Sequence, residues 1–412
     1  LTITDDDGAT DTIARTIVVD EAASSPPSAM PSAMTALAPF RLFDTRPEEA
    51  APGPKGVVAA DERIDITVAG VGAIPDDITA VAINLTVVAI EAPSFVTAWP
   101  AGQPRPTELS SLNVVESGTV RANLAIIPVG DDGSISVYTL RDAHLLGDVV
   151  GYFTESDATE SGRLVPRSPS RLLDTRPGPD PGPKGALEAD TELAVDVAGN
   201  PDVPPEAAAV IVNVTMTEPS APAFLTVWPE GARPTASSVN VSAAGGTSAN
   251  MVIVPIGADG TIRLYSNAST HVVIDLLGYV TGATAPSTTT GLFVPLDPSR
   301  AFDSRPSEPA PGPKGAIAAD STVTFEPGIV GGIPETASGV VLNVTYLSTA
   351  PGYVTLWATG TDQPATSNVN ASVGGDVRAN GVIVDVGDDG GLDAYALTEA
   401  HVVADVFGYL SG

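Results

Sequence analysis

The chain has 412 residues, with 19 Lys and Arg against 50 Asp and Glu, no cysteine, and 43% hydrophobic residues. This length suits two to four domains, and the apolar fraction is too high for a disordered polymer. A net charge of −31 argues against nucleic acid and anionic lipid surfaces as partners, because both bind clustered Lys and Arg. The lack of cysteine excludes disulfides, thiolate zinc sites and iron–sulfur clusters. No apolar run has the length of a membrane span, so we expect a folded protein without cofactor or membrane insertion.

Residues 1–20 predict a β-hairpin, followed by a Pro/Ser-rich linker over residues 21–36. The string TITDDDGATDT (Thr2–Thr12) closely resembles the end of a polycystic-kidney-disease (PKD) type immunoglobulin-like domain, where it leads into the last strand. An isolated hairpin is marginal in water and leaves two strand edges unpaired. Either the rest of that domain precedes it in a longer polypeptide, or the hairpin docks on a sheet of its own or a neighbouring chain.

The rest of the chain contains one sequence pattern three times. RLFDTRP at 41–47 recurs as RLLDTRP at 171–177 and RAFDSRP at 300–306, and PGPKG follows each time. Each copy continues with N-x-T and T-x-W and closes with H-x-x-x-D-x-x-G-Y, so that every His, Lys and Trp of the chain lies at an equivalent position. A period of about 130 residues exceeds that of solenoid repeats. We therefore expect three self-sufficient domains on short linkers, at residues 37–153, 163–280 and 291–410.

The copies are predicted to be all-β. Short runs rich in β-branched residues alternate with Gly, Pro and Asp-Gly, and no stretch of 12 residues has helical periodicity. Asp132-Gly133 and its equivalents lie between two such runs, which indicates tight turns. Seven to nine strands in about 118 residues bury a core by stacking two sheets or closing a barrel. We expect three tandem antiparallel β-sandwich domains preceded by the hairpin and linker.

The recurring charged residues are predicted to form a structural polar network. In D-T-R, the Asp and Arg are two apart, so on an extended strand they share a face, with Arg41 on the other. In H-x-x-x-D the two residues lie roughly 13 Å apart on a strand, too far to bind one ion together. We expect the Asp of this motif to accept from the Arg of D-T-R. The predicted network comprises Asp44, Arg46 and Asp148; Asp174, Arg176 and Asp275; and Asp303, Arg305 and Asp405.

Two further interpretations of the basic residues stay open. Nine of the 19 Lys and Arg lie in these motifs of an acidic chain, so the arginines could instead capture an anionic ligand. The PGPKG lysines, Lys55, Lys184 and Lys314, follow prolines that stiffen a loop, which indicates an exposed contact surface.

A candidate sugar platform lies around the three tryptophans. Alternation puts Phe95, Thr97 and Trp99 on one strand face, and Asn84 and Thr86 share a face of the preceding strand. If these strands are neighbours, an indole plate lies beside neutral hydrogen-bonding groups, which suits a sugar ring. The alternative is a tryptophan buried in the core. The platform residues are Asn84, Thr97 and Trp99; Asn213, Thr226 and Trp228; and Asn343, Thr355 and Trp357. The later Asn123, Asn250 and Asn380 are interpreted as caps of turns and strand ends.

No catalytic or metal-ligating residues are predicted, because no nucleophile elbow, zinc-binding or phosphate-loop motif occurs. Ser110, His144 and Asp44 are the best nominees for a triad, and nothing in the sequence places them together.

The whole repeat pattern is similar to one found in large secreted and cell-surface proteins of actinobacteria, beside PKD or hydrolase domains. The resemblance implies an extracellular, non-catalytic, modular part of a larger protein. Our leading hypothesis is a structural or adhesive protein whose partners are other copies of itself or extracellular polymers such as polysaccharide. The alternative function is a carbohydrate-binding array attached to a secreted hydrolase, and an enzyme is a third.

Overall fold

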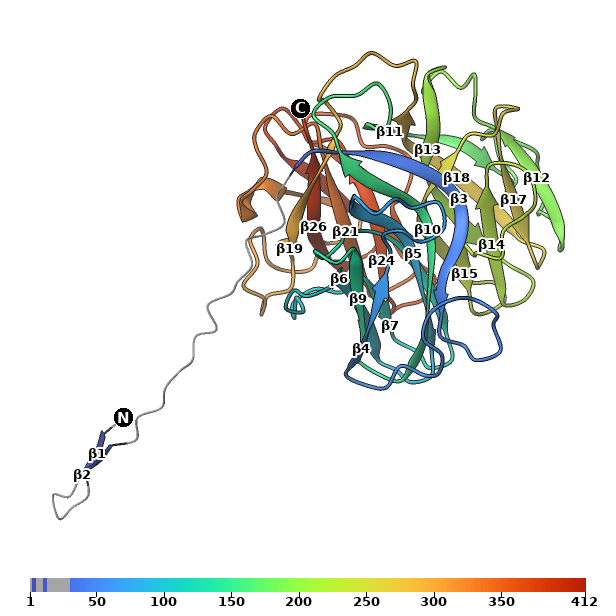
Figure 1. The fold of residues 1–412 in the computed structure, drawn as a ribbon. Coiled ribbons are helices and arrows are strands. Elements are labelled where there is room, and N and C mark those ends of the chain that lie inside the picture. The colour runs from blue at the N-terminus through green and yellow to red at the C-terminus, as the bar shows by residue number, and fades with distance from the viewer. Residues whose placement is uncertain (1, 5–9, 13–29) are drawn as a thin grey trace.

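The computed structural model describes residues 2–4, 10–12 and 30–412 (Figure 1). Strands β1 (Thr2–Thr4) and β2 (Thr10–Thr12) pair antiparallel, with Thr2 opposite Thr12. The remainder of the predicted hairpin and most of the predicted linker lie outside the described residues. Among the described residues the only helix is a short 3₁₀ turn, η1 (Pro327–Val330), and all strands belong to antiparallel sheets, so the all-β prediction is confirmed.

Each copy forms eight strands in two stacked sheets of four. In the first copy the strands are β3 (Ser32–Asp44), β4 (Glu62–Thr67), β5 (Ile78–Ala89), β6 (Ser94–Pro100), β7 (Leu112–Val114), β8 (Val120–Pro128), β9 (Ser134–Thr139) and β10 (Ala143–Glu155). In the second copy they are β11 (Leu164–Asp174), β12 (Thr191–Asp196), β13 (Ala207–Thr217), β14 (Ala223–Trp228), β15 (Val239–Val241), β16 (Thr247–Pro255), β17 (Thr261–Ser266) and β18 (His271–Thr281). In the third they are β19 (Phe293–Asp303), β20 (Ser321–Phe325), β21 (Gly339–Ser348), β22 (Gly352–Ala358), β23 (Val369–Ala371), β24 (Val377–Val384), β25 (Leu392–Ala396) and β26 (Ala400–Leu410).

The strand order is that of a jelly roll. One sheet of the first copy has the order β3-β10-β5-β8 and the other β4-β9-β6-β7, and the second and third copies repeat both orders. The chain therefore passes from one sheet to the other repeatedly, as in two Greek keys. The tight turns between the sixth and seventh strands contain Gly133, Gly260 and Gly390, all with φ between 72° and 80°, which confirms the Asp-Gly prediction.

The sheets containing β5, β13 and β21 are buried on both faces. In β5, Val81, Ile83, Leu85 and Val87 belong to the core between the two sheets of the first copy. The alternate residues, represented by Ala80, belong to a second core that the three copies share. This double burial explains why the strand is a nearly continuous apolar run.

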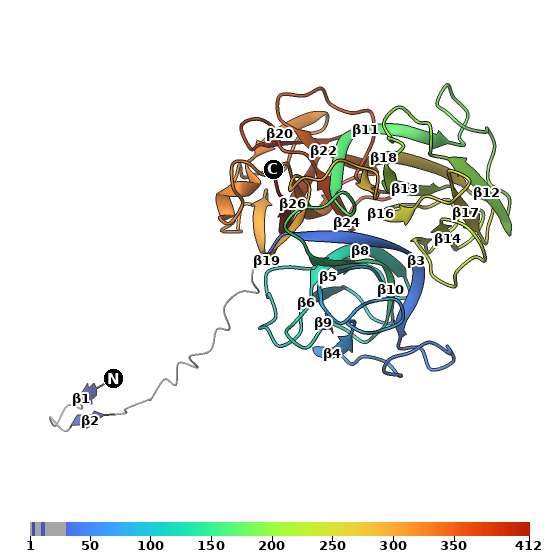
Figure 2. The same cartoon turned by 45° about the horizontal axis from the view of Figure 1, so that its top comes forward.

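The shared core makes the three copies one body around a pseudo-threefold axis. Strands β8, β16 and β24 contact one another along this axis, and Figure 2 shows them at the centre with the outer sheets at the periphery. Phe153 of the first copy packs on Phe293 of the third, with ring centroids 4.9 Å apart, and both are fully buried. The sequence predicted three self-sufficient domains on short linkers and did not predict a core shared between them.

The linkers take part in the same assembly. The first strand of the first copy begins at Ser32, inside the predicted linker 21–36. Met34 packs in the shared core, and its N–H bonds to Gly162 O at 2.7 Å. Phe293 pairs with Ser32, which joins the inner sheets of the third and first copies. The linkers at 154–162 and 281–290 bridge each other at Thr159 and Thr288.

Candidate functional site at the junctions between copies

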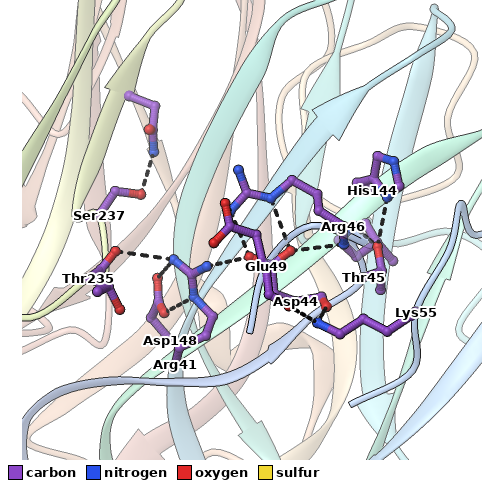
Figure 3. A network of polar contacts seen from close by, with 12 residues as sticks. Arg41, Asp44, Thr45, Arg46, Glu49, Lys55, His144, Asp148, Thr235 and Ser237 are labelled. Carbon is purple, nitrogen blue, oxygen red and sulfur yellow. Dashed lines mark hydrogen bonds and ion pairs between the residues drawn. The ribbon is translucent and has the colours of Figure 1, made fainter. Parts of the chain in front are cut away.

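The recurring charged residues of the first copy form a buried cluster at its junction with the second copy (Figure 3). Arg41 binds Asp148 through Nε and Nη2 and donates from Nη1 to Asp44 Oδ2 at 2.5 Å. Arg46 donates to both oxygens of Asp44, at 3.0 and 2.7 Å. Arg41 Nη2 also reaches Thr235 O of the second copy at 3.5 Å. The predicted network exists, but with a different pairing.

The sequence-based pairing is wrong because it treated the motif as a regular strand. A bulge skips Leu42 where β3 pairs with β10: Phe43 lies opposite Gly147, and Arg41 lies opposite Asp148. One inserted residue reverses the strand face, so Arg41 shares a side with Asp44. Asp148 therefore accepts from Arg41, the first arginine of the motif, and Arg46 binds Asp44.

The second and third copies repeat the cluster. Arg171 donates to Asp275 at 2.6 Å and Asp174 at 3.0 Å, and Arg176 binds Asp174 at 2.6 Å. In the third copy, Arg300 donates to Asp405 and Asp303, at 2.8 and 3.2 Å, and Arg305 binds Asp303 at 2.6 Å. Arg300 Nη2 also donates to Glu108 O of the first copy, which connects this cluster to the next junction.

The two aspartates of each cluster have opposite pKa shifts. Burial raises the pKa of Asp275 to about 6 and that of Asp405 to about 6, although Arg171 and Arg300 act in the opposite direction. Burial also acts to raise the pKa of Asp44, but its hydrogen bonds to Arg46 and the charges of Arg46 and Arg41 outweigh burial and lower it. The D-T-R aspartate is thus the ionised anchor of each cluster.

We predict that a carbon-13 NMR titration separates these groups. Asp275 and Asp405 are expected to titrate near pH 6, and the equivalents of Asp44 below the ordinary aspartate value of about 4. Because the native protein binds protons more tightly at Asp275 and Asp405 than the unfolded chain does, their contribution to stability is largest below about pH 4 and falls as the pH rises toward 6. The contribution of Asp44 has the opposite sign and is lost on acidification. Coincident midpoints for both classes would contradict the assignment.

The lysine and histidine of each copy fasten the same segment. Lys55 Nζ donates to Asp44 O at 2.6 Å. The second residue of PGPKG lies close to the buried Phe43: a Cβ on Gly53, whose φ is 92°, would come within 2.7 Å of Phe43 Cβ. His144 Nδ1 lies 3.2 Å from Thr45 Oγ1. The equivalent lysines, Lys184 and Lys314, make the same bond at 2.6 Å. The lysine side chains are exposed as predicted, but each ammonium binds a backbone carbonyl of its own copy.

The residues interpreted as caps, Asn123, Asn250 and Asn380, connect the copies to one another. Asn250 Nδ2 donates to Asn84 Oδ1 at 2.8 Å, and its Oδ1 accepts from Leu124 N–H at 3.0 Å, both in the first copy. Asn380 makes the equivalent bonds to Asn213 and Met251 of the second copy. Asn123 makes them to Asn343 and Gly381 of the third copy, which closes the ring. Each amide also donates to a carbonyl of its own copy, so all three are buried and satisfied.

The N-x-T asparagines complete these junctions instead of forming a sugar platform. Asn84 Nδ2 donates to Ser237 O of the next copy at 2.6 Å, and Asn213 and Asn343 donate to Ser367 O and Ser110 O. The platform required the asparagine and tryptophan strands to be neighbours. They are not, because β5 pairs with β10 and β8 in the inner sheet, and β6 pairs with β9 and β7 in the outer one.

The tryptophans are buried. Trp99 and Trp228 are 2% and 1% exposed, and Trp357 is 6% exposed. Trp99 Nε1 donates to Gln103 O at 2.8 Å, and Thr97 Oγ1 donates to Leu109 O at 2.9 Å, so the segment after β6 covers this face. Thr226 and Thr355 bond in the same way to Ala236 O and Thr366 O. None of the three rings is available as an exposed plate for a sugar.

The three residues nominated for a catalytic triad do not contact one another, because each is bonded to a different partner. Ser110 Oγ bonds Asn113, His144 faces Thr45, and Asp44 is held by Arg46. Among the described residues, no three His, Asp or Glu side chains are grouped as a metal site would need. In the same part of the chain no helix is long and apolar enough to cross a membrane.

No family model matches the chain, and no curated protein matches it. Among solved structures, it is similar at 10% identity to a chain from the atomic structure of Sulfolobus Turreted Icosahedral Virus, with 92% of each chain covered and a TM-score of 0.17. A chain described with the triple jelly roll fold and turret assembly of an archaeal virus matches at 10% identity over 93% of this chain and 92% of the other, also with a TM-score of 0.17. These scores are too low for either match to inform the function of this chain.

Proposed function

We propose that the chain is a non-enzymatic extracellular protein with a structural or adhesive role, in which the three copies act as one rigid head. The observation that supports this most is the use of the recurring side chains. The motif arginines, aspartates, asparagines and lysines bond to one another or to backbone groups, within and between copies. Side chains engaged in this way contribute to architecture, whereas a catalytic site needs a nucleophile and a base free to meet a substrate.

Each outer sheet has two edge strands. Those at one edge, β7, β15 and β23, contact strands of neighbouring copies, which leaves the three equivalent edges on the other side. Strands β4, β12 and β20 each pair on one side only, with β9, β17 and β25. An unpaired edge can accept a strand from another chain. The proposed partner is the N-terminal hairpin of a neighbouring copy of this protein, which would link successive heads into a surface fibre.

Deletion of residues 1–20 tests this proposal. In analytical ultracentrifugation, the 412-residue chain is expected to form concentration-dependent oligomers, and the deleted chain is expected to stay monomeric with an unchanged melting temperature. A second variant introduces proline at Ile64, the third residue of the edge strand β4, and is expected to weaken assembly from the accepting side. A monomeric full-length chain, or oligomers that survive the deletion, would refute docking by the hairpin.

A further inference from the structure

The outer sheet of each copy carries a pair of aromatic rings on the face that points away from the core between its two sheets. The pairs have ring centroids 5.9–6.0 Å apart and comprise Phe95 and Tyr138, Phe224 and Tyr265, and Tyr353 and Tyr395. In the first copy an arginine covers the tyrosine, because Arg105 Cζ lies 4.0 Å from the centroid of the Tyr138 ring. In the second copy Arg233 Cζ lies 3.4 Å from the centroid of the Tyr265 ring. Both of these tyrosines are buried.

The third copy lacks this cover. Gln363 lies where the other two copies have the arginine, directly before a proline in each case. Among the described residues no Lys or Arg lies over the Tyr395 ring. Tyr395 is partly exposed, unlike its two buried equivalents. The third copy therefore leaves open an aromatic face on which the other two copies stack a guanidinium group.

The surroundings of the Tyr395 ring favour a cation. The Tyr395 hydroxyl donates to the Asp320 carboxylate at 2.7 Å, and this bond raises the pKa of Tyr395 to about 12, which keeps the phenol neutral. Asp393 lies two residues before Tyr395 on the same face of β25, and the four strands of this sheet carry no Lys or Arg. A guanidinium group from outside the chain would thus meet an aromatic face flanked by two carboxylates.

The edge strand of the third copy leaves the approach to this ring open. Thr322 of β20 lies opposite Tyr395, whereas the equivalent edge residues are Arg63 in the first copy and Glu192 in the second. Threonine is shorter than either residue and carries no charge. A strand added beside β20 would lie two strand spacings, about 10 Å, from β25, with only the short side chain of Thr322 between them on this face. A long side chain on the added strand can cross that distance.

We propose that Arg15 of a neighbouring copy of this protein stacks on Tyr395 when the N-terminal segment of that neighbour pairs with β20. Arg15 is the only Lys or Arg among the first 40 residues, and it follows β2 by three residues, outside the described part of the chain. This inference rests on the hairpin docking proposed above and selects one of its three equivalent edges. Each head has one such arginine and one such ring, so heads link in a line and not in a branched network.

Sedimentation equilibrium of the 412-residue chain and its variants tests the contact. Arg15→Gln and Tyr395→Leu are each expected to weaken assembly by about fivefold or more, because each removes one side of a cation–π contact. The double variant is expected to assemble about as well as the single variants, since either change removes the same contact. Tyr395→Phe keeps the aromatic face and is expected to assemble within about twofold of the parent chain.

Gln363→Arg tests the site without removing a side chain from the sheet. The variant gives the third copy the arginine that covers the ring in the other two copies, so it is expected to weaken assembly as much as Tyr395→Leu does. Val373→Arg is the matched control, because it adds the same charge at an exposed residue of the loop before β24, and it is expected to leave assembly unchanged.

Proline substitutions compare the edges directly. Val323→Pro in β20 is expected to weaken assembly at least about tenfold more than Ile64→Pro, which changes the equivalent third residue of β4. Oligomers that survive deletion of residues 1–20 would refute hairpin docking and this contact together. Oligomers that need residues 1–20 but are unaffected by Arg15→Gln and Gln363→Arg, or that respond equally to the two prolines, would overturn this inference and leave hairpin docking in place.

Discussion

Replacing Asn250 with leucine is expected to lower the free energy of unfolding by at least about 3 kcal/mol, although the two side chains have the same number of non-hydrogen atoms and the same branching. The substitution removes the partners of Leu124 N–H and Asn84 Oδ1 in the first copy and of Ser238 O in its own. All three atoms belong to buried residues or the buried junction, and each unpaired buried group costs about 1–3 kcal/mol. Urea denaturation monitored by tryptophan fluorescence measures the change.

Asn113→Leu is the matched control for this substitution. Asn113 lies in β7 of the first copy. Its Oδ1 accepts one local bond from Ser110, and its Nδ2 has no hydrogen-bond partner among the described residues. Its replacement is expected to change the free energy of unfolding by no more than about 1 kcal/mol. If Asn250→Leu were equally mild, the ring of asparagines would not hold the copies together.

Alanine at Phe153 and alanine at Phe293 are each expected to cost about 3–5 kcal/mol, because both rings are fully buried in the core that the copies share. The rings belong to different copies and lie 4.9 Å apart, so the double variant should reveal a coupling energy of about 0.5–1.5 kcal/mol. The measurement is a double-mutant cycle from urea denaturation.

The control cycle combines alanine at Phe153 with alanine at Phe325. Phe325 stacks on Phe302 inside the sandwich of the third copy, away from the shared core. Its substitution is expected to add to that of Phe153 within about 0.5 kcal/mol. Equal coupling in both cycles, or none in either, would contradict direct packing between the first and third copies.

Local features of the fold could be predicted from the sequence. Strand positions follow from β-branched runs, and the turns from Asp-Gly pairs, because both depend on neighbouring residues. The sheet to which each strand belongs does not depend on neighbouring residues and could not be predicted. The strands carrying Asn84 and Trp99 are consecutive in the chain, yet the jelly roll puts them in different sheets. That separation, decided by distant strand pairing, is why the predicted sugar platform does not exist.

The pairs within the polar network could be predicted only in part from residues that are close in the sequence. Asp44 and Arg46 are two residues apart and were predicted only to share a strand face, with Arg46 assigned to Asp148; in the structure Arg46 binds Asp44 instead. The partner of Asp148 depends on a bulge at Leu42, and the sequence pattern alone does not reveal that bulge. Asn250 carried a usable signal, because a lone amide directly before the apolar run MVIVP is a buried polar group that must find a partner. The partner itself lies 166 residues away in another copy.

Differential scanning calorimetry of the 412-residue chain tests most directly whether the three copies are one cooperative body. If the shared core and the asparagine ring unite them, a single transition is expected, with a van't Hoff enthalpy about equal to the calorimetric enthalpy. Three copies that unfold independently would instead give a van't Hoff enthalpy of about one third of the calorimetric value, or separate transitions, and either result would contradict the account.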